Sequence, residues 1–120
     1  MTKRKPMSPI EGRWNIVSMT EWDEDYLHEA VQAYIEFEPR DYGTFQFGYV
    51  WGEMDSRFIE RDGNPAVEFS WEGNDESESV FGRGWAVLED GELNGMIFMH
   101  NGEESEFVAQ RAVKKIARKK

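Results

Sequence analysis

The stretch DSRFIERDGNPAVEFSWE, residues 55–72, places a turn sequence between two runs of strand-forming residues. Asp62-Gly63-Asn64-Pro65 suits a tight turn, because glycine and asparagine accept positive φ angles and proline fixes its own. After this turn the apolar residues of 67–71 alternate with polar ones, which is the two-residue period of a half-buried strand. The stretch therefore predicts a β-hairpin with strands over 55–61 and 66–72.

Similar segments recur along the chain at a spacing of about ten residues. The other expected strands cover residues 10–20, 33–38, 44–52, 80–89, 93–100 and 106–113. Acidic residues followed by apolar ones three to four positions apart predict one short helix near 23–32. Short turns between most of the strands predict an all-β, eight-stranded antiparallel up-and-down barrel with the helix after the first strand. Side chains can fill such a barrel, or it can hold one small ligand.

The composition is that of one acidic domain rich in aromatic residues. The chain has 120 residues, including 5 Trp, 8 Phe and 4 Tyr, and no Cys. One domain of this size buries about two-thirds of its unfolded surface, which is enough for a core. Without cysteine, disulfides, thiolate nucleophiles and cysteine-bound zinc are excluded, and a cytoplasmic location is expected.

Charge is segregated along the chain. A basic arm over residues 1–9 and a basic tail over 114–120 flank the barrel domain, 10–113, and the arm is expected to be disordered. Between Glu11 and Arg111 there are six arginines, no lysine and all 24 acidic residues, so this body carries a net charge of −18. Such a body repels phosphate backbones, so no nucleic-acid partner is expected. No apolar run reaches the roughly 20 residues of a membrane span, and no signal peptide or membrane partner is expected.

No catalytic constellation is recognisable in the sequence. His28 and His100 are the only histidines, which excludes a histidine-rich metal site but leaves open one or two histidines combined with carboxylates. The acidic clusters lack the spacing of a calcium-binding loop. We expect no catalytic residue, no metal and no cofactor, and we favour a binding protein over an enzyme.

Two arginines are the first candidates for ligand contact. Arg57 and Arg83 lie in the middle of expected strands in a body short of cations, and Arg83 shares a face with Phe81 and Trp85. Pointing inward, such an arginine would clamp a carboxylate. Pointing outward, it would pair with surface acids. The expected ligand-binding residues are Arg83, Arg57, Phe47, Tyr49, Phe69, Trp71 and Trp85.

An aromatic row and one glutamate leave several interpretations open. The row consists of Phe45, Phe47, Tyr49 and Trp51. It fits core filling, the lining of a pocket, or an exposed face that forms a dimer. Glu68 points outward if Phe69 and Trp71 point inward, whereas a bulge would bring it into the barrel with a raised pKa.

Gly12-Arg13-Trp14 opens the first expected strand, and Arg111 lies in the last one. With the helix and the eight-strand meander, these residues resemble the calycin superfamily, which includes lipocalins, fatty-acid-binding proteins and avidins. In those barrels the first-strand Trp packs at the closed end and an Arg of the last strand lies across it. The resemblance implies this closing role for Gly12, Trp14 and Arg111. Within that group the chain looks more like short cytosolic lipocalin-like bacterial proteins of unassigned function than like classical lipocalins.

The leading functional expectation is a non-enzymatic barrel that binds a small apolar or amphipathic ligand, including one with a carboxylate. The alternative is a filled barrel that acts by self-association, as a homodimer, or by binding a protein partner. An enzyme that uses Glu68 and Arg83 at the barrel mouth is the least favoured class, because no nucleophile or base accompanies them.

Overall fold

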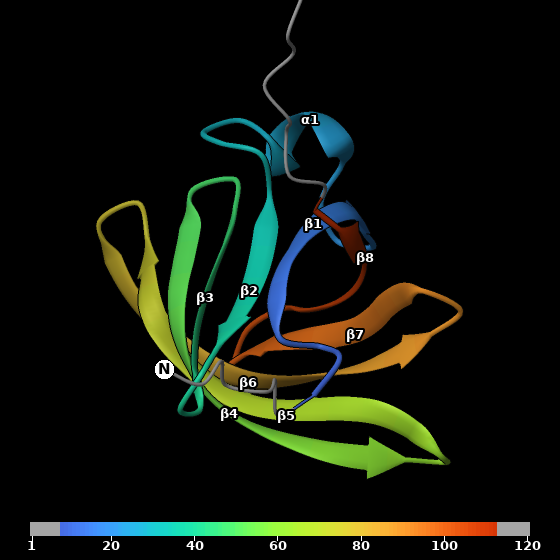
Figure 1. Cartoon of the computed structure of the whole chain (residues 1–120). Helices are drawn as coiled ribbons and strands as arrows, with labels where there is room; N and C mark the ends of the chain where they lie inside the picture. Colours follow the sequence, from blue (N-terminus) through green and yellow to red (C-terminus); the bar gives the residue numbers. More distant parts are fainter. Residues whose placement is uncertain (1–7, 113–120) are drawn as a thin grey trace, which may run out of the picture.

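The computed structural model describes residues 8–112, and in it eight antiparallel strands close into one barrel (Figure 1). The strands are β1 (Gly12–Met19), β2 (Tyr34–Glu38), β3 (Tyr42–Phe47), β4 (Val50–Arg61), β5 (Asn64–Asp75), β6 (Glu78–Glu89), β7 (Glu92–Met99) and β8 (Glu104–Arg111), and helix α1 (Glu24–Leu27) follows β1. Each strand pairs with its neighbours in sequence, and β8 pairs with β1. This confirms the expected all-β, up-and-down barrel with one short helix. Apart from Ser8 and Pro9, the expected arm lies outside the described residues, as does the tail.

The turn expected over 62–65 forms over two residues, Asp62 and Gly63, with Asn64 and Pro65 already in β5, and the β6–β7 turn is of the same kind. Asp62 and Gly63 have φ angles of 52° and 83°, and Asp90 and Gly91 have φ angles of 51° and 80°. Two successive positive φ angles are those of the type I′ turn, whose twist matches the twist of antiparallel strands. These turns set the register of the β4–β5 and β6–β7 hairpins.

The boundary between β3 and β4 differs from the expectation. Residues 44–52 were expected to form one strand, but the chain turns at Gly48 and Tyr49, so that Phe47 pairs with Val50. Gly48 has a φ of 58°, and its N–H donates to the Leu27 carbonyl at 2.8 Å. Across this two-residue turn the inward parity changes from odd to even residue numbers.

The expected row of four aromatic residues on one face is therefore wrong. Phe45 and Phe47 are buried in the barrel, whereas Tyr49 is exposed at the turn and Trp51 lies half-buried on the outer face. The alternation of aromatic residues continues through the turn and so conceals it. The turn itself carries no Asn-Gly or Asp-Gly pair that would have revealed it.

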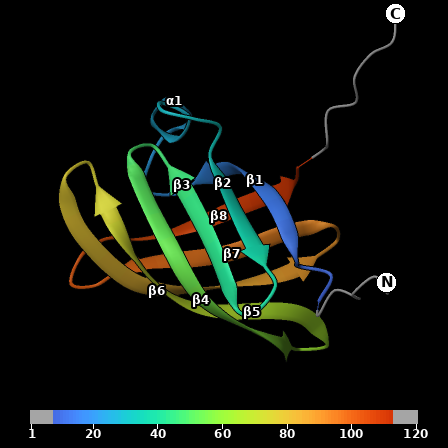
Figure 2. The same ribbon diagram turned by 60° about the vertical axis from the view of Figure 1, so that its left-hand side comes forward.

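Helix α1 is shorter than the expected range of 23–32. The Asp23 carboxylate caps it by accepting from the Tyr26 N–H at 3.0 Å, as acidic residues at a helix start predict. The helix ends at Leu27, because the next residue, His28, accepts from the Ala33 N–H at 3.1 Å and holds the chain in its return to β2. α1 lies at one end of the barrel (Figure 2).

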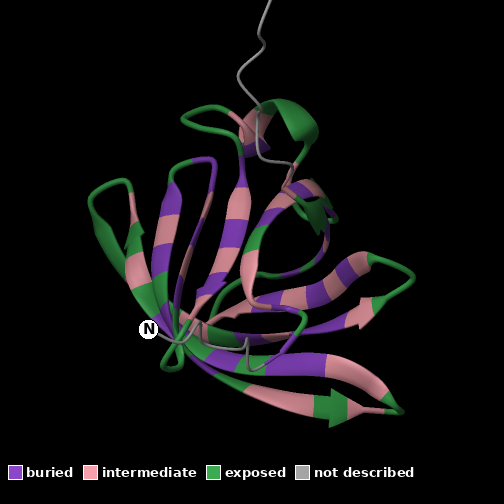
Figure 3. Ribbon diagram, viewed as in Figure 1, coloured by how far each residue is buried: buried purple, intermediate pink, exposed green. Residues whose placement is uncertain are grey.

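Buried and exposed residues alternate along the strands (Figure 3), and the inward ones form one core. Phe45 lies at its centre, with ring centroids 5.0 Å from Trp71 and 5.9 Å from Phe47. Phe37 and Phe69 continue this aromatic filling at 6.1 Å. Such rings each bury about 150–250 Å², so a few of them occupy most of a small barrel.

In residues 8–112, no helix is long and apolar enough to cross a membrane.

Candidate functional site

The first and last strands meet where Trp14 lies opposite Arg111. The Arg111 guanidinium carbon is 4.0 Å from the Trp14 ring centroid. Arg111 donates to the carbonyls of Glu11 at 2.8 Å and Pro9 at 2.6 Å, and the Trp14 indole N–H donates to the Ile10 carbonyl at 2.8 Å. Burial lowers the pKa of Arg111 below its ordinary value, but a guanidinium stays charged at neutral pH. The cation thus lies on the indole and ties the segment before β1 to β8.

Gly12 leaves room for this contact. Its φ of 117° is in the region that favours glycine, and a Cβ there would meet the Arg111 guanidinium. Gly12, Trp14 and Arg111 therefore lie together where β1 meets β8.

The expected ligand-binding residues are divided between the two faces of the sheet. Phe47, Phe69 and Trp71 are buried in the barrel, Arg57, Arg83 and Trp85 lie on its outer face, and Tyr49 is exposed at the β3–β4 turn. The β4–β5 ladder runs without a bulge from the pair Arg61–Asn64 to the pair Val50–Asp75. Because Phe69 and Trp71 point inward in this ladder, Glu68 points outward and is exposed.

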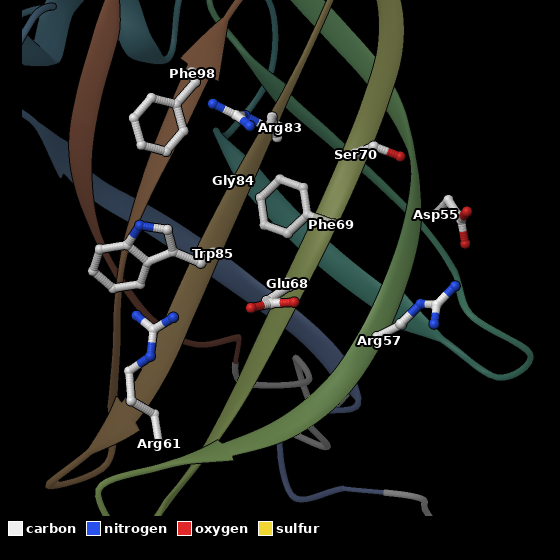
Figure 4. A pocket seen from close by; sticks show the side chains of 10 residues that line it. All are labelled: Asp55, Arg57, Arg61, Glu68, Phe69, Ser70, Arg83, Gly84, Trp85 and Phe98. Atoms are coloured by element: carbon white, nitrogen blue, oxygen red, sulfur yellow. The ribbon is translucent and has the colours of Figure 1, made fainter.

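An open groove of about 480 Å³ lies on the outer face of β4–β7 (Figure 4). We call it the arginine groove, after Arg57, Arg61 and Arg83, which line it together with Glu68, Trp85 and Phe98. The strand register builds it in two rows. Arg57, Glu68 and Trp85 lie side by side in one row, and Ser70, Arg83 and Phe98 lie side by side in the next.

Two of these arginines lie over aromatic rings. The Arg61 guanidinium carbon is 4.9 Å from the Trp85 ring centroid, and that of Arg83 is 5.8 Å from the Phe98 ring centroid. Figure 4 shows the Glu68 carboxylate between Arg57 and Trp85. Cations over ring faces are attracted by the ring quadrupole, and they keep N–H groups free at the guanidinium edge.

The arginines of the groove are not neutralised by ion pairs. Within residues 8–112, no carboxylate lies at ion-pair distance from Arg57, Arg61 or Arg83. By contrast Arg13, on β1, pairs with Glu36 at 3.5 Å and lies 3.8 Å from the Tyr34 ring centroid. In a body of net charge −18, the groove is net positive even though two carboxylates, Asp55 and Glu68, line it with the three arginines.

Arg61 and Phe98 were not among the expected site residues, although the turns contain the information that locates Phe98. A two-residue turn at Asp90 and Gly91 places Arg83 opposite Phe98 by counting outward along both strands. Arg61 joins the site for a different reason. Its side chain crosses β5 diagonally to reach Trp85 on β6, which no register count shows.

Gly84 explains how an aromatic residue fits on the inner side of the same strands. The Phe69 ring occupies the space where a Cβ of Gly84 would be. A glycine beside Arg83 in this way leaves room for an aromatic ring against the inner side of β6. In the described part of the chain, no cluster of three or more His, Asp or Glu is arranged to hold a metal ion.

The fold and the site together define a closed antiparallel barrel with a cationic, aromatic groove on its outside. Comparisons of the chain with models of protein families, with curated proteins and with solved structures find no match.

Proposed function

We propose that the protein is a small-molecule-binding barrel, and that its ligand is a small amphipathic anion held in the arginine groove. The observation that carries the proposal is the gathering of three of the body's six arginines in one groove, without ion pairs to described carboxylates. Guanidinium groups hold carboxylates and phosphates through paired hydrogen bonds. Trp85 and Phe98 would supply the apolar contact, and the role is one of binding rather than catalysis.

This proposal places the ligand on the outer face rather than inside the barrel. Inside, Phe45 packs against both Phe47 and Trp71, and all three are almost fully buried. Opening a ligand cavity there would separate well-packed rings at a cost of several kcal/mol. The outer groove already has the volume of a small-molecule site.

We also propose that the barrel is of the calycin type and that the protein is cytoplasmic. Support for the calycin type comes from the Gly12-x-Trp14 sequence on β1, the helix that follows β1, and the guanidinium of Arg111 on the Trp14 ring. The cytoplasmic location rests on the cysteine-free composition alone.

The test is a fluorescence titration with anilinonaphthalene sulfonate, an anionic amphipathic dye that brightens in apolar surroundings. We expect Arg57→Gln and Arg83→Gln each to raise the dissociation constant about tenfold, the effect of losing one charge-assisted hydrogen bond. Arg13→Gln is the matched control, since Arg13 lies on β1 outside the groove. Equal affinity in all four proteins would contradict the proposal.

A second candidate function is self-association, and Phe81 favours it. The Phe81 side chain is 53% exposed and stacks on the His100 ring with centroids 4.6 Å apart. Exposed aromatic residues of this kind are common at the centre of interfaces. Sedimentation velocity would show a wild-type homodimer that Phe81→Ser converts to a monomer. A wild-type monomer at high concentration would dismiss this candidate.

A further inference from the structure

We infer that the ligand of the arginine groove is a planar aromatic anion that carries a hydrogen-bond donor near its ring. This inference rests on the proposed function and narrows its chemistry. Aminobenzoates and nucleoside monophosphates both have these features, one with a carboxylate and the other with a phosphate.

The requirement for a ring comes from the lining of the groove. No residue that lines it has an aliphatic apolar side chain, and its apolar surface belongs to aromatic residues, with Trp85 and Phe98 on the outer face. An alkyl chain would find little to pack against there. A planar ring can stack on the indole or the phenyl group, and also on a guanidinium plane.

The requirement for an anion comes from the arginines. Arg61 and Arg83 are already oriented over Trp85 and Phe98, so little side-chain freedom is lost when they bind. Arg57 adds a third guanidinium group, on the side of Glu68 that faces away from Trp85. A ring lying between these guanidinium groups brings its acidic substituent within reach of their N–H donors.

The requirement for a donor comes from Glu68. Its carboxylate lies between Arg57 and Trp85, is exposed, and has no ion pair among the described residues. An ionised carboxylate is negatively charged, so it repels an anion. Because it only accepts hydrogen bonds, it attracts the N–H of an amino group. Glu68 therefore discriminates against simple aromatic acids and in favour of those with an N–H beside the ring.

Calorimetric titration with anthranilate, benzoate, decanoate and adenosine monophosphate separates these requirements. We expect anthranilate or adenosine monophosphate to bind about tenfold more tightly than decanoate, the typical gain from one stacked ring. If anthranilate binds more tightly than adenosine monophosphate, the groove recognises a carboxylate. If adenosine monophosphate binds more tightly, the groove recognises a phosphate. Anthranilate should also bind more tightly than benzoate, and Glu68→Ala, which removes the acceptor, should remove that difference.

Trp85→Leu tests the stacking directly. It should weaken the aromatic probes about tenfold and leave decanoate unchanged. Trp51→Leu is the matched control, because Trp51 lies on the outer face of β4 but outside the groove. Circular dichroism of each variant checks that the barrel is intact.

Two results would overturn the inference in distinguishable ways. If decanoate binds more tightly than the aromatic probes and still requires Arg83, the proposed function stands and the aromatic ligand is wrong. If Arg57→Gln and Arg83→Gln change the binding of no probe, the dye included, then the arginine groove is not a binding site and both proposals fail.

Discussion

At the scale of single residues, the contact between Trp14 and Arg111 joins the two ends of the described chain. Trp14 is 2% exposed, and Arg111 crosses its ring while donating to two carbonyls that precede β1. The pair thus combines apolar burial with hydrogen bonds that fix the start of β1 beside β8. Residues almost a hundred positions apart in sequence depend on each other at this point.

Trp14→Ala should lower the free energy of unfolding by about 3–5 kcal/mol, the usual cost of removing a buried aromatic side chain. Urea unfolding followed by circular dichroism measures this loss. Trp51→Ala is the matched control, since Trp51 is only half-buried on the outer face and should cost clearly less. Equal losses in the two variants would show that Trp14 has no special part in closing the barrel.

At the scale of elements, helix α1 and the β3–β4 turn support each other. Gly48 donates to the Leu27 carbonyl, and the Tyr26 hydroxyl accepts from the Tyr49 N–H at 3.3 Å. Trp22, just before α1, lies 4.9 Å from Phe47 by ring centroids. These contacts cover one end of the barrel with aromatic side chains.

Gly48→Ala should destabilise the fold more than Gly63→Ala. Both glycines have positive φ angles, which cost an alanine about 1–2 kcal/mol. A Cβ at Gly48 would also meet the Tyr26 ring, whereas a Cβ at Gly63 would meet nothing within 4 Å. Urea unfolding of the two variants gives the comparison, and a larger loss in Gly63→Ala would contradict the docking of α1 on this turn.

The surroundings of Tyr26 lead us to expect that the folded protein loses stability in alkaline solution. Burial raises the pKa of Tyr26 above its ordinary value of 10.0, outweighing the lowering by its hydrogen bond from Tyr49, and the charge of Asp75 raises it further. The contribution of the neutral phenol is therefore fully present below pH 10.0 and is lost as the pH rises through the folded-state pKa.

Unfolding titrations from neutral to strongly alkaline pH check this sign. Tyr26→Phe cannot ionise, so its stability should fall less steeply above pH 10.0 than that of the wild type. A steeper fall in Tyr26→Phe would mean that the folded state favours the phenolate at this position.

At the scale of the whole molecule, local sequence patterns predicted the barrel better than the site. Asp62-Gly63 and Asp90-Gly91 set the register of two of the eight strand pairings, because their turn type admits one pairing. The Gly48-Tyr49 turn was not predicted, because neither the alternation of aromatic residues nor the turn residues themselves indicated it. Tertiary contact with α1, rather than local preference, accounts for a turn at that point.

The arginine groove could be predicted only in part, for a physical reason. Outward charged residues look alike in sequence whether they form a site or a solvated surface. Arg57 and Arg83 stood out only because the body has few cations. That they share a groove with Arg61 depends on the twist of β4–β6, which brings diagonal neighbours together.

The most direct test of the central claim, that the ligand lies on the outer face, is an NMR titration with anilinonaphthalene sulfonate. The indole N–H signals of the five tryptophans report on separate parts of the barrel. We predict that the Trp85 signal moves most, while those of Trp14, buried at the closing contact, and Trp22, beside Phe47, stay in place. Movement of the Trp14 and Trp22 signals with Trp85 unchanged would place the ligand inside the barrel and contradict the account.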